Sequence, residues 1–263
     1  MKYFYLLLAS LFLCSAPPAS AEEKKDENYV EFIYPLVTRR PIVENEAEFK
    51  IKHLRTKDGQ ETEFVAEGGF RILPFWEAVL EVPAVLVHDR GGATRGGLGD
   101  IGIENRFLVF KSIPHQAQVV LGFEVDAPTG SKHRGLGGEW GVEPYASGGV
   151  KFGRVNLVGS VGHEWGHLNA RHNDEKERAV KADFAAGYEL SKLFAALLEV
   201  NTVTLTKGGE DEGLHNKTQV YLTPGINIMP IEEMTIRLGV QIPVTRAKEF
   251  YHQVHAGMSW FFD

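Results

Sequence analysis

Residues 163–167 read His-Glu-Trp-Gly-His, the H-E-x-x-H spacing of zinc metalloproteases. That chemistry requires a helix, because only there do the two histidines point at one metal. The preceding residues instead alternate with period two, which predicts a strand. In a strand, positions i and i+4 stand about 13 Å apart, whereas zinc–nitrogen bonds are near ~2.1 Å. We therefore expect no metal here, and we interpret His163, Trp165 and His167 as interfacial rings at the outer end of a membrane strand.

A second pattern, Gly97-Leu98-Gly99-Asp100-Ile101-Gly102, spells G-x-G-x-x-G, which in dinucleotide-binding folds opens a helix under a pyrophosphate. The chain after Gly102 continues with period two, because Ile103, Asn105 and Phe107 share one parity. A strand cannot present a helix N-terminus to a phosphate. We interpret the glycines as easing strand curvature at a barrel rim, and we expect no cofactor.

Nucleophilic chemistry has no local signature in this chain. Ser160, Ser259 and ten histidines are present, but no sequence pattern brings a serine or an aspartate next to a histidine in the way that hydrolases require. Pairing between distant residues stays open, so an outer-membrane enzyme is an alternative, although we expect no enzyme. The net charge of −7 disfavours nucleic acid as a partner.

The chain begins like a secretory precursor. Lys2 precedes an apolar stretch over residues 3–13, and Ala19-Ser20-Ala21 is a cleavage site of the A-x-A kind. We therefore expect residues 1–21 to be a cleavable signal peptide, with the outer membrane as the destination of the mature protein.

Removal of the signal leaves a chain of two parts. It takes away the only cysteine, Cys14, so we expect no disulfide and no thiolate metal site. Residues 22–45 are a charge cluster followed by a stretch of little period, and we expect an N-terminal extension that lies either in the periplasm or in a barrel lumen. Residues 46–263 carry the barrel.

The remainder of the chain alternates with period two, which is typical of strands with two different faces. Every odd position of residues 117–127 is apolar, and so is every even position of residues 234–244. The segments have the length that a tilted strand needs to cross a bilayer, about twice that of a soluble strand. We predict an all-β fold, an antiparallel transmembrane β-barrel of about 12 strands. The predicted strands are Glu46–Lys57, Glu61–Leu73, Trp76–His88, Leu98–Lys111, Gln116–Pro128, Glu139–Phe152, Asn156–His167, Lys181–Leu190, Leu193–Thr206, Asn216–Met229, Met234–Thr245 and Glu249–Phe262.

The connections between these segments alternate in length, as in outer-membrane barrels. Short turns such as Pro74-Phe75 alternate with longer polar loops, and Asp89–Gly97 and Thr129–Gly138 are two of these. One stretch, Asp174–Val200, is rich in good helix formers, and a helix there competes with two strands. We favour strands, because residues 182–190 alternate.

The inward parity of the strands carries the charges, since a Lys or Arg on the lipid face costs ~2–4 kcal/mol near the midplane. Two interpretations stay open, a polar passage or a paired network that fills the interior. Acids outnumber bases, so an open lumen predicts a weak preference for cations. The candidate pore-lining residues are Asp100, Glu104, Arg106, Glu124, Asp126, Glu143, Lys151, Glu189, Glu199, Lys217, Arg237 and Gln241.

The glycine-rich middle of the chain resembles a known family. Gly97-Leu98-Gly99-Asp100 opens a strand, Ala127-Pro128-Thr129-Gly130 closes the next, and a glycine-rich loop leads to Trp140 and a strand that ends near Phe152. These features resemble the meta-pathway phenol-degradation family of outer-membrane barrels. The resemblance implies a barrel that moves small molecules across the outer membrane, and it supplies no binding residues. The C-terminus departs from the usual assembly signal, because Asp263 follows the terminal aromatic residue.

We therefore expect a passive channel for small solutes, aromatic or hydrophobic molecules among them. The expected partners are outer-membrane lipid, a small solute, and the barrel-assembly machinery during biogenesis. The alternatives are a structural or interaction barrel with a closed lumen and, third, the enzyme already mentioned.

Overall fold

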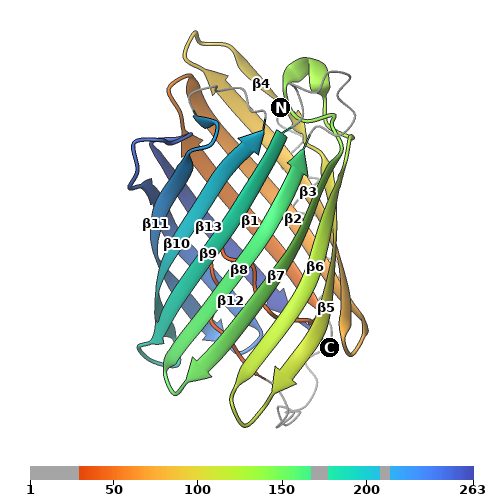
Figure 1. Ribbon diagram of the computed structural model, residues 1–263, viewed down its shortest axis with the longest axis vertical. Coiled ribbons are helices and arrows are strands. Elements are labelled where there is room, and N and C mark those ends of the chain that lie inside the picture. The colour runs from red at the N-terminus through yellow and green to blue at the C-terminus, as the bar shows by residue number, and fades with distance from the viewer. Residues whose placement is uncertain (1–29, 167–176, 208–213) are drawn as a thin grey trace.

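The structure, a computed structural model, describes residues 30–166, 177–207 and 214–263. Thirteen strands form one antiparallel sheet that curls into a barrel (Figure 1). The barrel closes because β2 pairs with both β1 and β3. Closure leaves no open sheet edge along the wall, as a β-structure in lipid requires. Among the described residues, no helix is long and apolar enough to cross a membrane.

The strands follow one another along the chain, and each pairs with its neighbours in sequence except β4 and β5, which both pair with β3. Their bounds are β1 Glu46–Arg55, β2 Gly59–Leu73, β3 Trp76–Asp89, β4 Thr94–Leu98, β5 Ile101–Ser112, β6 Ala117–Ala127, β7 Gly141–Phe152, β8 Val155–Gly166, β9 Glu177–Glu189, β10 Phe194–Lys207, β11 Thr218–Ile231, β12 Met234–Pro243 and β13 His252–Phe261, with a 3-10 turn, η1, at Lys132–Arg134.

Two of the thirteen strands share one position in the wall. β4 pairs with the second half of β3, and β5 pairs with the first half of β3. The register shifts by one residue between Leu98 opposite Ala84 and Gly102 opposite Glu81. The shift falls at Gly99–Asp100 and has the character of a β-bulge. Counted by positions in the wall, this is a closed antiparallel barrel of twelve strands, with β4 and β5 sharing one position. The predicted fold class is confirmed.

The barrel has two different ends. β1 and β13 meet with Glu46 opposite Phe261, so both ends of the barrel domain lie at the same rim. This rim, here called the turn end, carries the short connections, whereas the opposite loop end carries η1 and the longer ones (Figure 1). Outward positions such as Leu121, Phe184 and Leu238 are apolar and exposed, as lipid contact requires.

Two local predictions have different outcomes. Residues 174–200 contain β9 and β10 where the structure describes them, so the helix alternative is wrong. Strands prevail because a helix here would leave the ladders of β8 and β11 unpaired within the membrane. The predicted loop Asp89–Gly97 is also wrong in part, because β4 extends the hairpin beyond the wall. The predicted signal peptide, residues 1–21, lies outside the described residues.

Candidate functional site in the barrel lumen

The lumen holds a separate piece of the chain. Residues 30–45, here called the plug, precede β1 and contain no regular strand. Most of their side chains are buried, and Val30 and Phe32 are almost completely inaccessible. Apolar plug residues pack against inward side chains near the turn end, among them Val158 on β8 and Leu197 on β10. The plug therefore occupies the space that an open pore would need.

The barrel wall has glycines where the plug approaches most closely. A Cβ at Gly187 would lie 1.3 Å from Cδ1 of Ile33, and one at Gly239 would lie 2.2 Å from Cδ1 of Leu36. Gly149 stands in the same relation to Phe32, with a Cβ-to-Cε1 distance of 2.9 Å. Any larger side chain at these positions would occupy the volume that the plug now fills.

A single carboxylate binds the bend of the plug. Glu199 on β10 is fully buried. Its oxygens accept hydrogen bonds from the backbone N–H groups of Leu36 (2.6 Å), Val37 (3.2 Å) and Thr38 (2.8 Å), and from the Thr38 hydroxyl (2.6 Å). Charge-assisted bonds of this kind are stronger than neutral ones. The plug forms no regular helix or strand that could accept hydrogen bonds from these three backbone N–H groups, and Glu199 accepts them instead.

Plug carbonyl groups are bound by inward side chains from several strands. The donors are Asn227 to the carbonyl of Tyr34 at 2.9 Å, Arg237 to that of Pro35 at 2.7 Å, Gln118 to that of Pro41 at 2.8 Å, and the Ser147 hydroxyl to that of Arg39. Because these donors stand on β6 and β7 and on β11 and β12, the plug contacts the inner surface of the barrel on two separate parts of its circumference.

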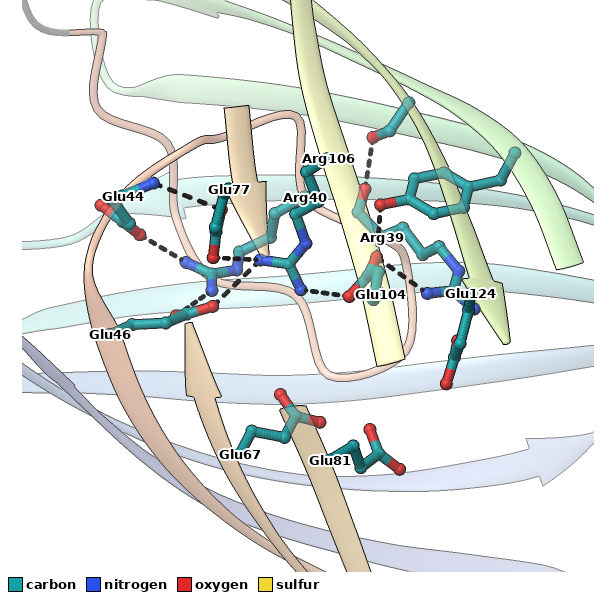
Figure 2. Close-up of polar contacts among 12 residues, drawn as sticks. Arg39, Arg40, Glu44, Glu46, Glu67, Glu77, Glu81, Glu104, Arg106 and Glu124 are labelled. Atoms are coloured by element: carbon teal, nitrogen blue, oxygen red, sulfur yellow. Dashed lines mark hydrogen bonds and ion pairs between the residues drawn. The ribbon is translucent and has the colours of Figure 1, made fainter. Parts of the chain in front are cut away.

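Arg39 sits among three carboxylates, and Figure 2 shows two of them, Glu104 and Glu124. Its guanidinium contacts Glu104 at 3.1 Å, Glu124 at 2.5 Å and Glu143 at 3.2 Å, and it lies over the Tyr145 ring with 4.5 Å to the centroid. Burial alone would lower the pKa of Arg39, but attraction to the carboxylates raises it well above its usual value. The plug therefore keeps this positive charge at any physiological pH.

Arg40 belongs to a second network, nearer the turn end (Figure 2). It contacts Glu44 at 2.9 Å and also pairs with Glu46, the first residue of β1. Arg106 on β5 links this network to the first one, because it contacts Glu46 at 3.0 Å, Glu77 at 3.3 Å and Glu104 at 2.7 Å. One continuous set of ion pairs thus joins the plug to β1, β3 and β5.

The structure separates the twelve candidate residues into groups. Five of them contact the plug directly, and these are Glu104, Glu124, Glu143, Glu199 and Arg237. Arg106 contacts Glu104 and Glu46, which themselves bind plug arginines. Four others lie on inward positions away from the plug bend, and these are Asp126, Lys151, Glu189 and Gln241.

Three members of this last group, Lys151, Glu189 and Gln241, bind one another or another wall residue. Lys151 and Glu189 form an ion pair at 2.7 Å, and Gln241 donates to Asn201 at 3.1 Å. The remaining two candidates lie outside the strands. Asp100 accepts from the backbone of Gly130 and Gly138 at the loop end, and Lys217 precedes β11. The pore-lining role of all twelve stays a prediction.

Sequence reasoning missed the plug residues and several of their partners, with Glu46 and Glu77 among them. Arg39 and Arg40 form an arginine pair in a stretch that is otherwise largely apolar, and that contrast was the available signal. Glu46 and Glu77 are completely buried at the turn end, and each begins or nearly begins a strand, where alternation is hardest to assign.

The H-E-x-x-H residues stand on a strand and not on a helix. His163 and Trp165 lie on the outward face of β8 with ring centroids 4.5 Å apart, whereas Glu164 faces inward and pairs with Lys181 at 2.8 Å. His167 lies outside the described residues. Within the described ranges, no group of three or more His, Cys, Asp or Glu side chains is arranged to hold a metal ion.

Comparison with known proteins decides the family. A model of the family described as "Putative MetA-pathway of phenol degradation" matches residues 60–246. The chain belongs to this family. The resemblance seen in the sequence is thus confirmed. No curated protein sequence matches the chain.

Solved structures of outer-membrane barrels share the fold of this member of the phenol-degradation family. The COG4313 outer membrane channel from Pseudomonas putida F1 aligns with a TM-score of 0.64 and 10% identity, over 88% of this chain and 100% of that one. The NanC porin aligns with a TM-score of 0.57 and 10% identity, over 82% and 99%. The KdgM porin gives 0.52 and 10%, over 83% and 99%. At these identities the likeness establishes the fold alone.

Proposed function

We propose that this protein is a channel for small molecules in the outer membrane, and that the plug closes it reversibly. The observation that carries the proposal is the way in which the lumen is filled. The space is occupied by a separate segment seated on the wall glycines Gly149, Gly187 and Gly239. A barrel built only as a closed structure would fill its interior with its own side chains. Removing this plug would leave a passage.

The bonds that hold the plug are of a reversible kind. They are hydrogen bonds from wall side chains, ion pairs and apolar contacts, and a new set of water contacts could replace each of them. Many inward groups are engaged in these contacts, and the described residues show no inward nucleophile–base pair, which supports a conduit over an enzyme.

Orientation and location follow from the two ends. Short turns face the periplasm and long loops face outward in outer-membrane barrels. We therefore infer that the plug enters from the periplasmic side, where β1 begins, and that residues 1–21 direct export. The neighbours named as porins and as an outer membrane channel support transport as the role of this fold.

The solute class follows from the charges that plug removal would expose. Without Arg39, the carboxylates of Glu104, Glu124 and Glu143 would face the lumen, with Arg106 still bound to Glu104 and Lys181 still bound to Glu143. Carboxylate rings favour cations. We infer that the unplugged channel prefers cationic over anionic small solutes.

A reversible tether tests whether the plug is the gate. A Cβ at position 187 lies 3.5 Å from Cβ of Ile33, within the range that disulfides adopt. The double variant Ile33→Cys, Gly187→Cys, expressed without Cys14, therefore locks the plug when oxidised and frees it when reduced. In planar bilayers we expect channel openings in the reduced form. Oxidation should lower the frequency of these openings at least tenfold.

The two single-cysteine variants are the controls, and oxidation should leave their conductance unchanged. Cation preference is measured in the reduced state from the reversal potential across a salt gradient. Conductance that is equal in both redox states would show that solutes pass without plug movement. A complete lack of conductance in every state would overturn the channel proposal and favour a structural barrel.

A further inference from the structure

The arginines on the strands differ in their partners. Arginines that face the lumen, such as Arg106 and Arg237, are paired with carboxylates. Arg55 and Arg178 stand on the outward face at the loop end, are exposed, and form no ion pair with any carboxylate of the described residues. Exposed guanidinium groups next to a lipid-facing surface are available to bind an anionic group.

The first of these arginines ends an apolar column on the seam between β13 and β1. At the turn end, the exposed Trp260 lies opposite Ala47, and eight residues further along β1 Arg55 lies opposite His252. Eight residues span about 26 Å along a strand, which at a strand tilt of about 40° corresponds to about 20 Å of the ~25 Å height of the apolar band of a barrel. Arg55 thus stands in the outer part of this band, from where its long side chain can reach the headgroups.

Further cationic and aromatic groups surround Arg55. Lys248, in the connection before β13, lies over the Tyr251 ring with 4.9 Å between Nζ and the centroid. The backbone of Tyr251 donates to the carbonyl of Arg55 at 2.8 Å, so these residues share one rim. The neighbouring acid is Glu249. A ring and a cation at this height are typical of groups that meet lipid headgroups.

The second arginine repeats this arrangement on the seam between β8 and β9. Arg178 lies opposite Trp165, and the His163 ring lies beside that tryptophan at 4.5 Å between centroids. Below them the outward column is apolar and exposed, with Val161 on β8 and Phe184 on β9. Two separate seams therefore end, at the same rim, in an arginine with an imidazole and an aromatic ring nearby.

We propose that each of these two seams binds a phosphorylated glycolipid of the outer leaflet, with Arg55 or Arg178 on a phosphate group of the lipid and the apolar column of that seam against its acyl chains. A guanidinium donates two parallel hydrogen bonds to a phosphate, which is why arginine suits this ligand. The orientation comes from the proposed function, because it places the loop end outside. The lipid contact itself does not depend on whether the barrel conducts.

The test uses the full folded barrel in detergent and diphosphoryl lipid A as the probe. Bound lipid is counted by native mass spectrometry, with phosphatidylethanolamine and inorganic phosphate as competitors. We expect lipid A to bind at least tenfold more tightly than phosphatidylethanolamine, and inorganic phosphate not to displace it at equal concentration. Arg55→Gln with Arg178→Gln should weaken lipid A binding about tenfold.

The matched control removes two exposed cations at the turn end, Arg154→Gln with Lys192→Gln, and should leave binding unchanged. Arg55→Lys with Arg178→Lys keeps both charges and should bind with intermediate strength. This lysine pair is the variant to test if the glutamine pair fails to fold. Equal binding by wild type and the glutamine pair, or equal binding of both lipids, would overturn the proposal. Displacement by inorganic phosphate would reassign the arginines to free anions. If the protein binds lipid A but shows no conductance in planar bilayers, only the proposed function is refuted.

Discussion

The two limbs of the plug are held by different forces. The first limb, residues 30–37, lies on wall glycines and apolar side chains, with Ile33 against Gly187 and Leu36 against Gly239. The second limb, residues 38–45, carries both arginines and is held by ion pairs to wall carboxylates, Glu124 with Arg39 and Glu46 with Arg40. Shape decides the position of the first limb, and charge decides that of the second.

The difference separates fit from release. Van der Waals contact with a glycine surface is short-ranged and insensitive to salt, so the first limb fixes where the plug sits. Ion pairs respond to ionic strength and to any cation that competes for the carboxylates, so the second limb is the part that a charged solute can disturb. Glu199 stands where the limbs meet and binds the backbone of both.

Removing Glu199 should disrupt both limbs together, and we expect the largest effect there. In Glu199→Leu three buried N–H groups lose their acceptor, at a cost of about 3 kcal/mol or more for the seated plug. Trypsin cleavage after Arg39 then reports plug release, and its rate should rise about a hundredfold.

The control for this change is Glu233→Leu, at an exposed turn, which should leave the cleavage rate unchanged. Glu199→Gln retains one acceptor oxygen and should fall between the two. A plug that stays protected in Glu199→Leu would mean that the limbs hold independently of their junction.

Arg39→Gln should disturb the second limb alone. It leaves Glu104, Glu124 and Glu143 facing one another without the plug cation, at a cost of roughly 2–3 kcal/mol, because the side chain keeps some exposure to solvent. The fraction of time open in planar bilayers should rise about fiftyfold at 0.1 M salt. The ratio to wild type should shrink at 1 M, because the Debye length falls from about 10 to about 3 Å and screening of the Arg39 ion pairs raises the open fraction of the wild type. Arg39→Lys keeps the charge and should change little; a salt-independent effect of Arg39→Gln would argue against ion pairing.

Gly187→Val should disturb the first limb, with the smallest of the three effects. The added side chain occupies the place of Ile33, and overpacking of this kind costs about 1–3 kcal/mol. Tryptic cleavage after Arg39 should accelerate about tenfold, equally at low and high salt.

A second-site change sharpens this prediction. Ile33→Ala in the Gly187→Val background frees the same volume and should restore protection. Gly159→Ala, on the outward face of the neighbouring strand, serves as the glycine control, because a Cβ there meets only a carbonyl oxygen at 3.6 Å. Failure of Ile33→Ala to rescue would show that the valine acts on the wall and not through the plug.

Much of the fold could be predicted from the sequence, because a membrane wall imposes a simple rule on every strand. Outward residues meet lipid and inward residues do not, so a period of two persists through segments such as residues 117–127 and 234–244. The same rule identified inward charges such as Glu104 and Arg237. It also separated β9 and β10 from a helix in spite of their composition.

The plug could be placed only by the tertiary structure. Residues 30–45 have no period, because they face the interior on every side and form no ladder. The carboxylates that hold Arg39 come from positions 65, 85 and 104 residues further along the chain. No local pattern records such a meeting. By itself the sequence determined the wall and the sign of its inner surface, and the closure of the wall around its own N-terminal segment decided that the lumen is occupied.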